Sequence, residues 1–145
     1  MKKIIIITIC LLMTVLYSCK AEEAENMEVT NSATITVIND VKEADFWILP
    51  QTQENQKTTL WGTATAAKVQ TGESRQAFLS EPGDGGLYLL RMIDADGFFY
   101  SADGIILRSG WVIRIKGNDR HEVTAEVTDE NGALDNTYDV FSARL

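Results

Sequence analysis

Residues 111–128 read Trp-Val-Ile-Arg-Ile-Lys-Gly-Asn-Asp-Arg-His-Glu-Val-Thr-Ala-Glu-Val-Thr, and this stretch indicates the fold class most clearly. An apolar side chain stands at every second position from Trp111 to Ile115 and from Val123 to Val127, and all the residues between them except Val112 are polar. The apolar positions of the two segments are Trp111, Ile113, Ile115, Val123, Ala125 and Val127. A period of two residues is typical of a strand with one dry face and one wet face. The stretch therefore predicts two antiparallel strands joined by a tight turn at Gly117-Asn118-Asp119.

The same period continues through the rest of the chain after residue 33. We expect further strands over residues 34–38, 46–49, 75–79, 87–93 and 138–145, with short apolar segments at 98–100 and 105–107. Residues 87–93 are apolar on both faces except at Arg91, which predicts a central strand covered on both sides. Turn signals such as Asp96-Gly97 and Asp103-Gly104 recur between these segments. Residues 63–69 are the only helical candidate, and they could equally be loop.

These elements predict an all-β fold for residues 33–145. Short strands separated by regularly spaced turns are typical of antiparallel sandwiches and small barrels. We expect an Ig-like antiparallel β-sandwich of about seven or eight strands.

The N-terminus carries a targeting pattern. Met1-Lys2-Lys3 is a short basic start, and residues 4–17 form an apolar run interrupted only by Thr and Cys. A bilayer-spanning helix needs about 20 such residues, so the run is too short for a permanent anchor and has the length typical of a secretory signal peptide. A buried N-terminal helix is the alternative, but no polar face interrupts the run. We therefore expect residues 1–18 to be a signal peptide.

A lipid-attachment motif ends this run. Leu16-Tyr17-Ser18-Cys19 resembles the lipobox of bacterial lipoproteins, with Tyr17 at a position where many members have a small residue. The resemblance implies cleavage after Ser18 and acylation of Cys19, with fatty acids such as palmitate. Two or three acyl chains hold a protein stably, whereas one chain holds it only marginally. Cleavage as a plain secreted protein is the alternative.

Residues 19–32 join the lipidated cysteine to the domain. They are acidic, lack aromatic side chains and show no sustained period, which predicts a flexible tether. Alternatively, Lys20-Ala21-Glu22-Glu23 resembles the basic-then-acidic signal that directs some bacterial lipoproteins to the cell surface. Lys20 also stands where an aspartate retains many lipoproteins in the inner membrane. We expect attachment to the outer membrane, on its periplasmic or its cell-surface side.

Charge and cysteine content exclude several classes of function. The 145 residues hold 13 Lys/Arg and 21 Asp/Glu, a net charge of −8, which argues against a nucleic-acid partner. The two cysteines are Cys10, inside the signal peptide, and Cys19. The mature domain therefore has no cysteine for a disulfide, a zinc site or a nucleophile. We expect a monomer that depends on its hydrophobic core.

Few residues suggest catalysis or metal binding. His121 is the only histidine and opens a predicted strand, where we expect solvent exposure, and no serine lies in a Gly-x-Ser-x-Gly turn. Asp94-Ala95-Asp96-Gly97 could open a calcium loop, but Phe98 and Ile105 occupy positions where an EF-hand needs oxygen ligands. An irregular calcium site from Asp94, Asp96 and Asp103 stays open beside their use in hairpin turns. We expect no enzyme and no cofactor.

The three tryptophans are the remaining candidates for binding. Trp111 shares a face with Ile113 and Ile115, which predicts a core position. Trp61 follows a polar loop and is the best candidate for an exposed aromatic platform, with Trp47 as its possible partner. Such a platform would suit a glycan or a peptide.

Several turn and strand motifs resemble those of a small exported β-sandwich domain found in bacterial envelope proteins. They are Ile35 to Asn39, Trp61-Gly62, Thr71 to Arg75 and Leu90 to Gly97. The resemblance implies a fold and no particular activity. We therefore expect a non-catalytic binding or structural module, with an unknown protein or glycan partner. The alternative is an acidic inhibitor of a basic enzyme such as lysozyme, because residues 19–145 carry 11 basic and 21 acidic side chains.

Overall fold

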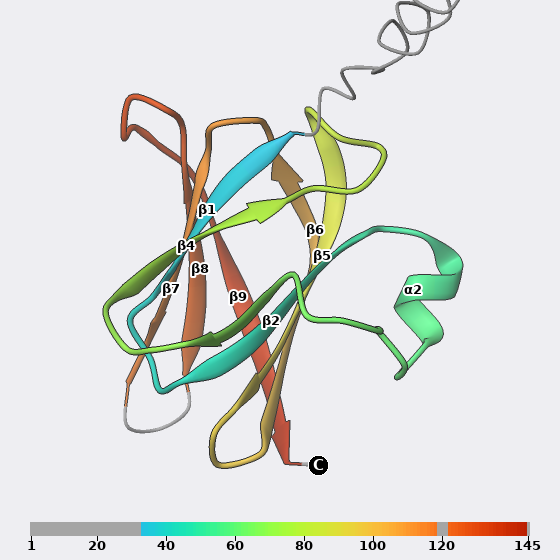
Figure 1. The fold of residues 1–145 in the computed structure, drawn as a ribbon, viewed down its shortest axis with the longest axis vertical. Helices are drawn as coiled ribbons and strands as arrows, with labels where there is room; N and C mark the ends of the chain where they lie inside the picture. The colour runs from blue at the N-terminus through green and yellow to red at the C-terminus, as the bar shows by residue number, and fades with distance from the viewer. Residues whose placement is uncertain (1–32, 119–121, 145) are drawn as a thin grey trace, which may run out of the picture. The chain divides into compact units, whose positions relative to one another are not determined.

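The computed structural model describes residues 33–118 and 122–144, all of which belong to the compact unit Ser32–Leu145 (Figure 1). These residues form nine strands and one short helix: β1 (Thr34–Asn39), β2 (Ala44–Pro50), α2 (Gln53–Lys57), β3 (Ala66–Val69), β4 (Glu73–Phe78), β5 (Gly86–Asp94), β6 (Phe98–Leu107), β7 (Val112–Gly117), β8 (Val123–Thr128) and β9 (Leu134–Arg144). The predicted all-β fold is confirmed. The segments predicted to be a signal peptide and a tether, together with Cys19 and His121, lie outside the described residues.

The strands form one mixed sheet in the order β3-β2-β5-β6-β9-β8-β7-β1-β4. Every neighbouring pair is antiparallel except β1 and β7, which run parallel. The long strand β9 links two groups of strands, because residues 134–140 pair with β8 and residues 141–144 pair with β6. We call β4, β1, β7, β8 and the start of β9 half A, and we call the end of β9, β6, β5, β2 and β3 half B.

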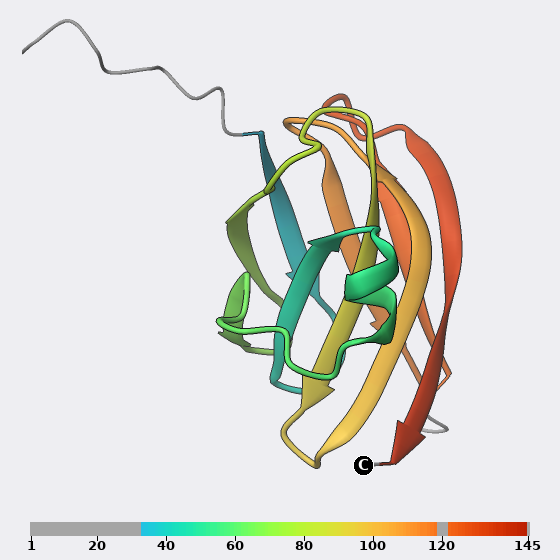
Figure 2. The ribbon, with the colours of Figure 1, turned by 90° about the vertical axis from the view of Figure 1, so that its right-hand side faces the viewer.

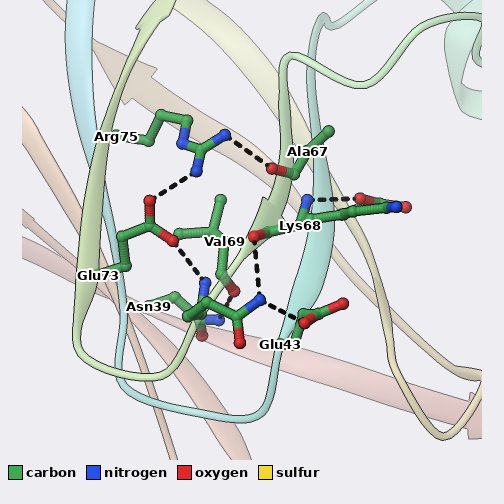
Figure 3. A network of polar contacts seen from close by, with 9 residues as sticks. Asn39, Glu43, Ala67, Lys68, Val69, Glu73 and Arg75 are labelled. Atoms are coloured by element: carbon green, nitrogen blue, oxygen red, sulfur yellow. Dashed lines mark hydrogen bonds and ion pairs between the residues drawn. The ribbon is translucent and has the colours of Figure 1, made fainter.

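The two end strands of this sheet, β3 and β4, contact each other, so the sheet nearly closes on itself. We call the line where β3 and β4 meet the seam. Polar side chains connect the two strands there, as Figure 3 shows. The Arg75 guanidinium donates to the Ala67 carbonyl at 3.0 Å and pairs with Glu73 at 2.5 Å. The hydrogen bond from Arg75, and next the one from the Gln70 backbone N–H, lower the pKa of the exposed Glu73 carboxyl. The seam is therefore joined by side chains in place of a backbone ladder.

A buried amide sits at one end of the same seam. Asn39 is fully buried at the end of β1. Its Nδ2 donates to the carbonyls of Lys42 at 2.8 Å and Val69 at 2.7 Å, and its Oδ1 accepts from the Val41 N–H at 3.1 Å. Three chain segments are thus joined through one side chain, which Figure 3 shows beside Val69.

One hydrophobic core takes side chains from both halves of the sheet. The faces predicted for residues 111–116 and 120–128 are confirmed, since their apolar members are buried: Trp111, Ile113, Ile115, Val123, Ala125 and Val127. From half B the core receives Phe46, Ile48, Leu90 and Met92. As predicted, β5 lies inside the sheet and is covered on both sides, since even Leu89 on its outer face is fully buried.

Three sequence-based expectations about elements are wrong. Among the described residues there are nine strands, not seven or eight. Asp103-Gly104 is not a turn between two short strands. It is an irregularity inside the ten-residue β6, where the register against β5 shifts between Tyr88 and Leu90. Gly104 has φ +73 there, because a bulge as well as a turn can require the left-handed conformation that glycine accepts.

The helical candidate over residues 63–69 is also wrong. Residues 66–69 form the strand β3, and the only helix among the described residues is α2, upstream of it. Alanine favours helices and is depleted in strands, but pairing with β2 overrides this local preference here.

Candidate functional site

The outer face of half B carries two rows of side chains that cross its strands in register. One row runs from Trp47 on β2 through Arg91 and Ser101 to Phe141 on β9. The parallel row consists of Asp45, Ile93, Phe99 and Ala143. Residues two apart on a strand share a face, and their neighbours Phe46, Met92 and Tyr100 point into the core. Both rows therefore face away from the core.

The connection between β2 and β3, residues 51–65, folds back over this face. Figure 2 shows α2 and its flanking loops in front of half B. Thr52 caps α2 by accepting from the Asn55 N–H at 3.0 Å. The Gln51 Oε1 accepts from the Gly104 N–H at 2.7 Å, and the Thr65 hydroxyl accepts from the Ile48 N–H at 2.9 Å. Both ends of the connection are thereby tied to the sheet.

This connection brings Trp61 onto the sheet beside aromatic rings of half B. The ring centroids of Trp61 and Trp47 lie 5.4 Å apart at an angle of 57°. Trp61 also stacks on Phe99, with centroids 5.3 Å apart and planes 15° apart. The Trp47 indole N–H donates to the Gly62 carbonyl at 3.1 Å, and that of Trp61 donates to the Thr58 carbonyl at 2.9 Å. Hydrogen bonds and ring contacts therefore fix both indoles on the outer face.

The two tryptophans named by the sequence thus lie together, and two phenylalanines were missed. Phe99 stacks on Trp61, and Phe141 follows in the row of Trp47 with 74% of its surface exposed. We call Trp47, Trp61, Phe99 and Phe141 the aromatic patch. The sequence Phe98-Phe99-Tyr100-Ser101 has no alternation that would show which ring faces outward, and the position of Phe141 depends on the long-range pairing of β6 with β9.

A buried charge lies within the same rows. Arg91 is only 6% exposed. Its Nη1 donates to the carbonyls of Leu90 at 2.9 Å and Ala102 at 3.3 Å, and it pairs with Asp103 Oδ1 at 2.7 Å. The Asp103 side chain itself is 50% exposed. The structure thus fixes a carboxylate at the surface against a buried guanidinium.

The three aspartates proposed for calcium have separate partners. Asp94 Oδ1 accepts from the N–H groups of Asp96 at 3.0 Å and Phe98 at 2.9 Å, which is the hairpin-turn arrangement. Asp96 pairs with Lys42, and Asp103 pairs with Arg91. In the described part of the chain, no three acidic or other metal-ligating side chains gather to hold an ion.

The second carboxylate oxygen of Asp94 forms a hydrogen bond with a core residue. Its Oδ2 accepts from the Tyr100 hydroxyl at 3.0 Å. Burial and then this hydrogen bond to Asp94 raise the pKa of Tyr100 to about 12. The tyrosine is therefore neutral under physiological conditions.

Two surface hollows lie away from the aromatic patch. A hollow of about 330 Å³ is lined by residues that include Asp40, Lys42 and Asp94. Asp40 pairs with Arg114, Lys42 pairs with Asp96, and Asp94 accepts a hydrogen bond from Tyr100. A second, of about 390 Å³, lies on the outer face of half A. There Lys116 and Glu126 pair with each other at 2.7 Å. The charged groups named here all have partners within the chain.

Trp111 lies in the core, as its alternation predicts, with the Arg108 guanidinium 5.7 Å from its ring centroid. Within residues 33–118 and 122–144, no helix combines the length and apolar character needed to span a bilayer.

Comparisons with known proteins give no further assignment. The sequence matches no family model, and neither the curated proteins nor the solved structures contain a match.

Proposed function

We propose that this protein is a lipid-anchored protein of the bacterial outer membrane whose β-domain is a non-catalytic binding module. The anchor rests on the sequence around Cys19. The binding role rests on one observation: three aromatic rings from distant parts of the chain, Trp47, Trp61 and Phe99, gather outside the core. Leu60 beside them is 87% exposed, and Phe141 is 74% exposed. Exposed apolar side chains on one face of a domain are typical of binding sites.

The fold expected from the sequence fits this role. We infer that halves A and B face each other as the two sheets of an Ig-like sandwich. The shared core, which includes Ile113 of half A and Phe46 of half B, supports this arrangement. Such a frame holds side chains on its outer faces in fixed positions, which lowers the entropy lost on binding.

The anchor is tested by metabolic labelling with an alkyne analogue of palmitate. Wild-type protein should take up the label, and Cys19→Ala should not. Equal labelling of the two proteins, or an unprocessed N-terminus in the mass spectrum of the wild type, would contradict lipidation.

The binding role is tested by tryptophan fluorescence. A protein of residues 33–145, which contains the whole described core, is titrated with the polysaccharide fraction and the protein fraction of bacterial envelopes. We expect one fraction to change the emission of Trp47 and Trp61, while buried Trp111 contributes a constant background. Trp61→Phe should remove most of the change. No response to either fraction would refute the binding role.

A further inference from the structure

The strand β4, at one end of the sheet, has a backbone edge without a neighbouring strand. Within the described residues, β4 forms a backbone ladder with β1 alone, and Figure 2 shows it at the margin of the fold. Across the seam, β3 is joined to β4 by the Arg75 side chain, which lies on the same face of β4 as buried Ala77. The edge of β4 that points away from β1 is therefore open.

The hydrogen bonds of β1 show which groups of β4 point to this open edge. The N–H groups of Thr36 and Asp40 donate toward β7, to carbonyls at 3.0 and 2.8 Å. Even-numbered residues of β1 thus bond to β7, and odd-numbered residues bond to β4. The bond from the Leu79 N–H to the Ala33 carbonyl, at 2.8 Å, agrees with this alternation.

The outward backbone groups of β4 belong to Ser74, Gln76 and Phe78. Odd-numbered residues of β1 lie opposite odd-numbered residues of β4, so the N–H and C=O groups of the even-numbered ones point away from β1. The side chains of all three are exposed. Proteins commonly protect an edge strand with proline, lysine or another charge, and these three positions carry none of them. The edge can therefore accept another extended strand.

The outer face beside this edge is uncharged. The residues of β1 in register with Ser74, Gln76 and Phe78 are Ile38, Thr36 and Thr34. Residues 33–145 as a whole hold 10 basic and 17 acidic side chains, so two copies of the domain repel each other in most orientations. At the open edge of β4, a second copy meets no opposing row of acidic groups.

The strand β4 is also complementary to itself. In an antiparallel pairing about a twofold axis, Gln76 lies opposite Gln76 of the second copy, and Ser74 lies opposite Phe78 of the second copy. A carboxamide both donates and accepts, so the two glutamines can bond to each other. The Phe78 ring, 67% exposed, packs over the small serine, and the symmetry repeats this contact. The outward N–H and C=O groups of all three residues find partners.

We propose that two copies of this protein pair through β4, which joins their sheets edge to edge. The interface is a single pair of strands and is smaller than those of stable dimers. We expect a dissociation constant on the order of 0.1–1 mM, so that the monomer expected from the sequence is the form present in dilute solution. This surface is separate from the aromatic patch, and the inference does not depend on the proposed function.

Cysteine cross-linking tests the pairing, because residues 33–145 contain no cysteine. In the twofold arrangement the Cα atoms of the two residues 76 lie about 5.5 Å apart, within the range that a disulfide spans. The two residues 74 lie about 14 Å apart, because four residues of strand separate them along the axis of β4. Under mild oxidation, Gln76→Cys should therefore form a linked dimer about tenfold faster than Ser74→Cys, the control on the same strand and face.

Sedimentation equilibrium measures the dimer without a cross-link. At about 1 mM, at least half of the wild-type protein of residues 33–145 should be dimeric. Gln76→Pro should be monomeric, because it removes an outward N–H that the β1–β4 ladder does not use, a position where edge strands tolerate proline. Gln76→Lys, which places like charges opposite each other, should also be monomeric. Circular dichroism and melting curves establish that each protein is folded.

Three results would overturn the pairing. The first is a wild-type protein that stays monomeric at about 1 mM, which would leave the edge of β4 to some other strand or to none. The second is equal cross-linking at positions 74 and 76, which would show chance collision. The third is a dimer that persists in Gln76→Lys, which would place the interface elsewhere, even if Gln76→Pro failed to fold.

Discussion

Single buried polar side chains join segments of this fold through hydrogen bonds. Asn39 is the clearest example, since it satisfies two carbonyls and one N–H from segments that no strand pairing joins. An amide can donate and accept at once, which an apolar side chain cannot do. The sequence placed Asn39 at the end of a strand, but its partners are up to 30 residues away and could not be foreseen.

Asn39→Ala should lower the free energy of unfolding by about 2–3 kcal/mol, because it leaves buried backbone groups without partners. The control is Asn136→Ala, on an exposed side chain of β9, with an expected cost below about 0.5 kcal/mol. Chemical denaturation of both variants measures the difference. Similar small costs for the two variants would show that the contacts of Asn39 do not stabilise the fold.

Tyr100 links stability to alkaline pH. Its pKa is raised from 10 to about 12 by burial and by its hydrogen bond to Asp94. A raised pKa means that the folded state holds the proton that the unfolded state loses, so the stabilisation is complete below pH 10 and is lost between pH 10 and 12. The slope is at most about 1.4 kcal/mol per pH unit.

We expect the free energy of unfolding of Tyr100→Phe to fall less steeply than that of the wild type over this pH range. Denaturation series at pH 8, 10 and 11 test it. Parallel pH profiles for the two proteins would mean that Tyr100 titrates normally.

At the scale of elements, strands with strict alternation were predictable and irregular segments were not. The buried and exposed faces of β7 and β8 follow directly from residues 111–128. By contrast, the sequence predicts two short segments in place of β6, because Asp103-Gly104 has the composition of a turn. In the structure the strand continues through these two residues. The connection that carries α2 and Trp61 shows no sequence period. Hydrogen bonds of Gln51 and Thr65 with the sheet hold it in place, and these depend on the tertiary structure.

Two neighbouring substitutions in β8 test the alternation. Val123→Asp should cost several kcal/mol, about 3 or more, because it buries an unpaired charge in the core. Thr124→Asp should cost little, since Thr124 is on the outer face, and Lys116 on one side offsets Asp139 on the other. Thermal melts of both variants provide the comparison. Equal loss of stability would contradict the assignment of Val123 to the buried face of β8 and of Thr124 to its outer face.

At the scale of the whole molecule, the two outer faces of the sheet have different character. Half A presents charged pairs such as Lys116–Glu126 and a separate exposed Phe78, whereas half B presents the aromatic patch. The sequence predicted Trp47 and Trp61 as candidates but could not show that they meet, because 13 residues, which include the helix α2, lie between them. Their meeting with Phe99 depends on the complete sheet.

Hydroxyl-radical footprinting is the most direct test of whether half B is the binding face. The protein of residues 33–145 is oxidised alone and in the presence of bacterial envelope extract, and modified residues are quantified by mass spectrometry. Four large apolar side chains act as reporters, since all are more than half exposed: Leu60, Phe141, Phe78 and Leu134. We predict protection of Leu60 and Phe141 with unchanged oxidation of Phe78 and Leu134. Protection of Phe78 and Leu134 instead, or of none of the four, would contradict binding through half B.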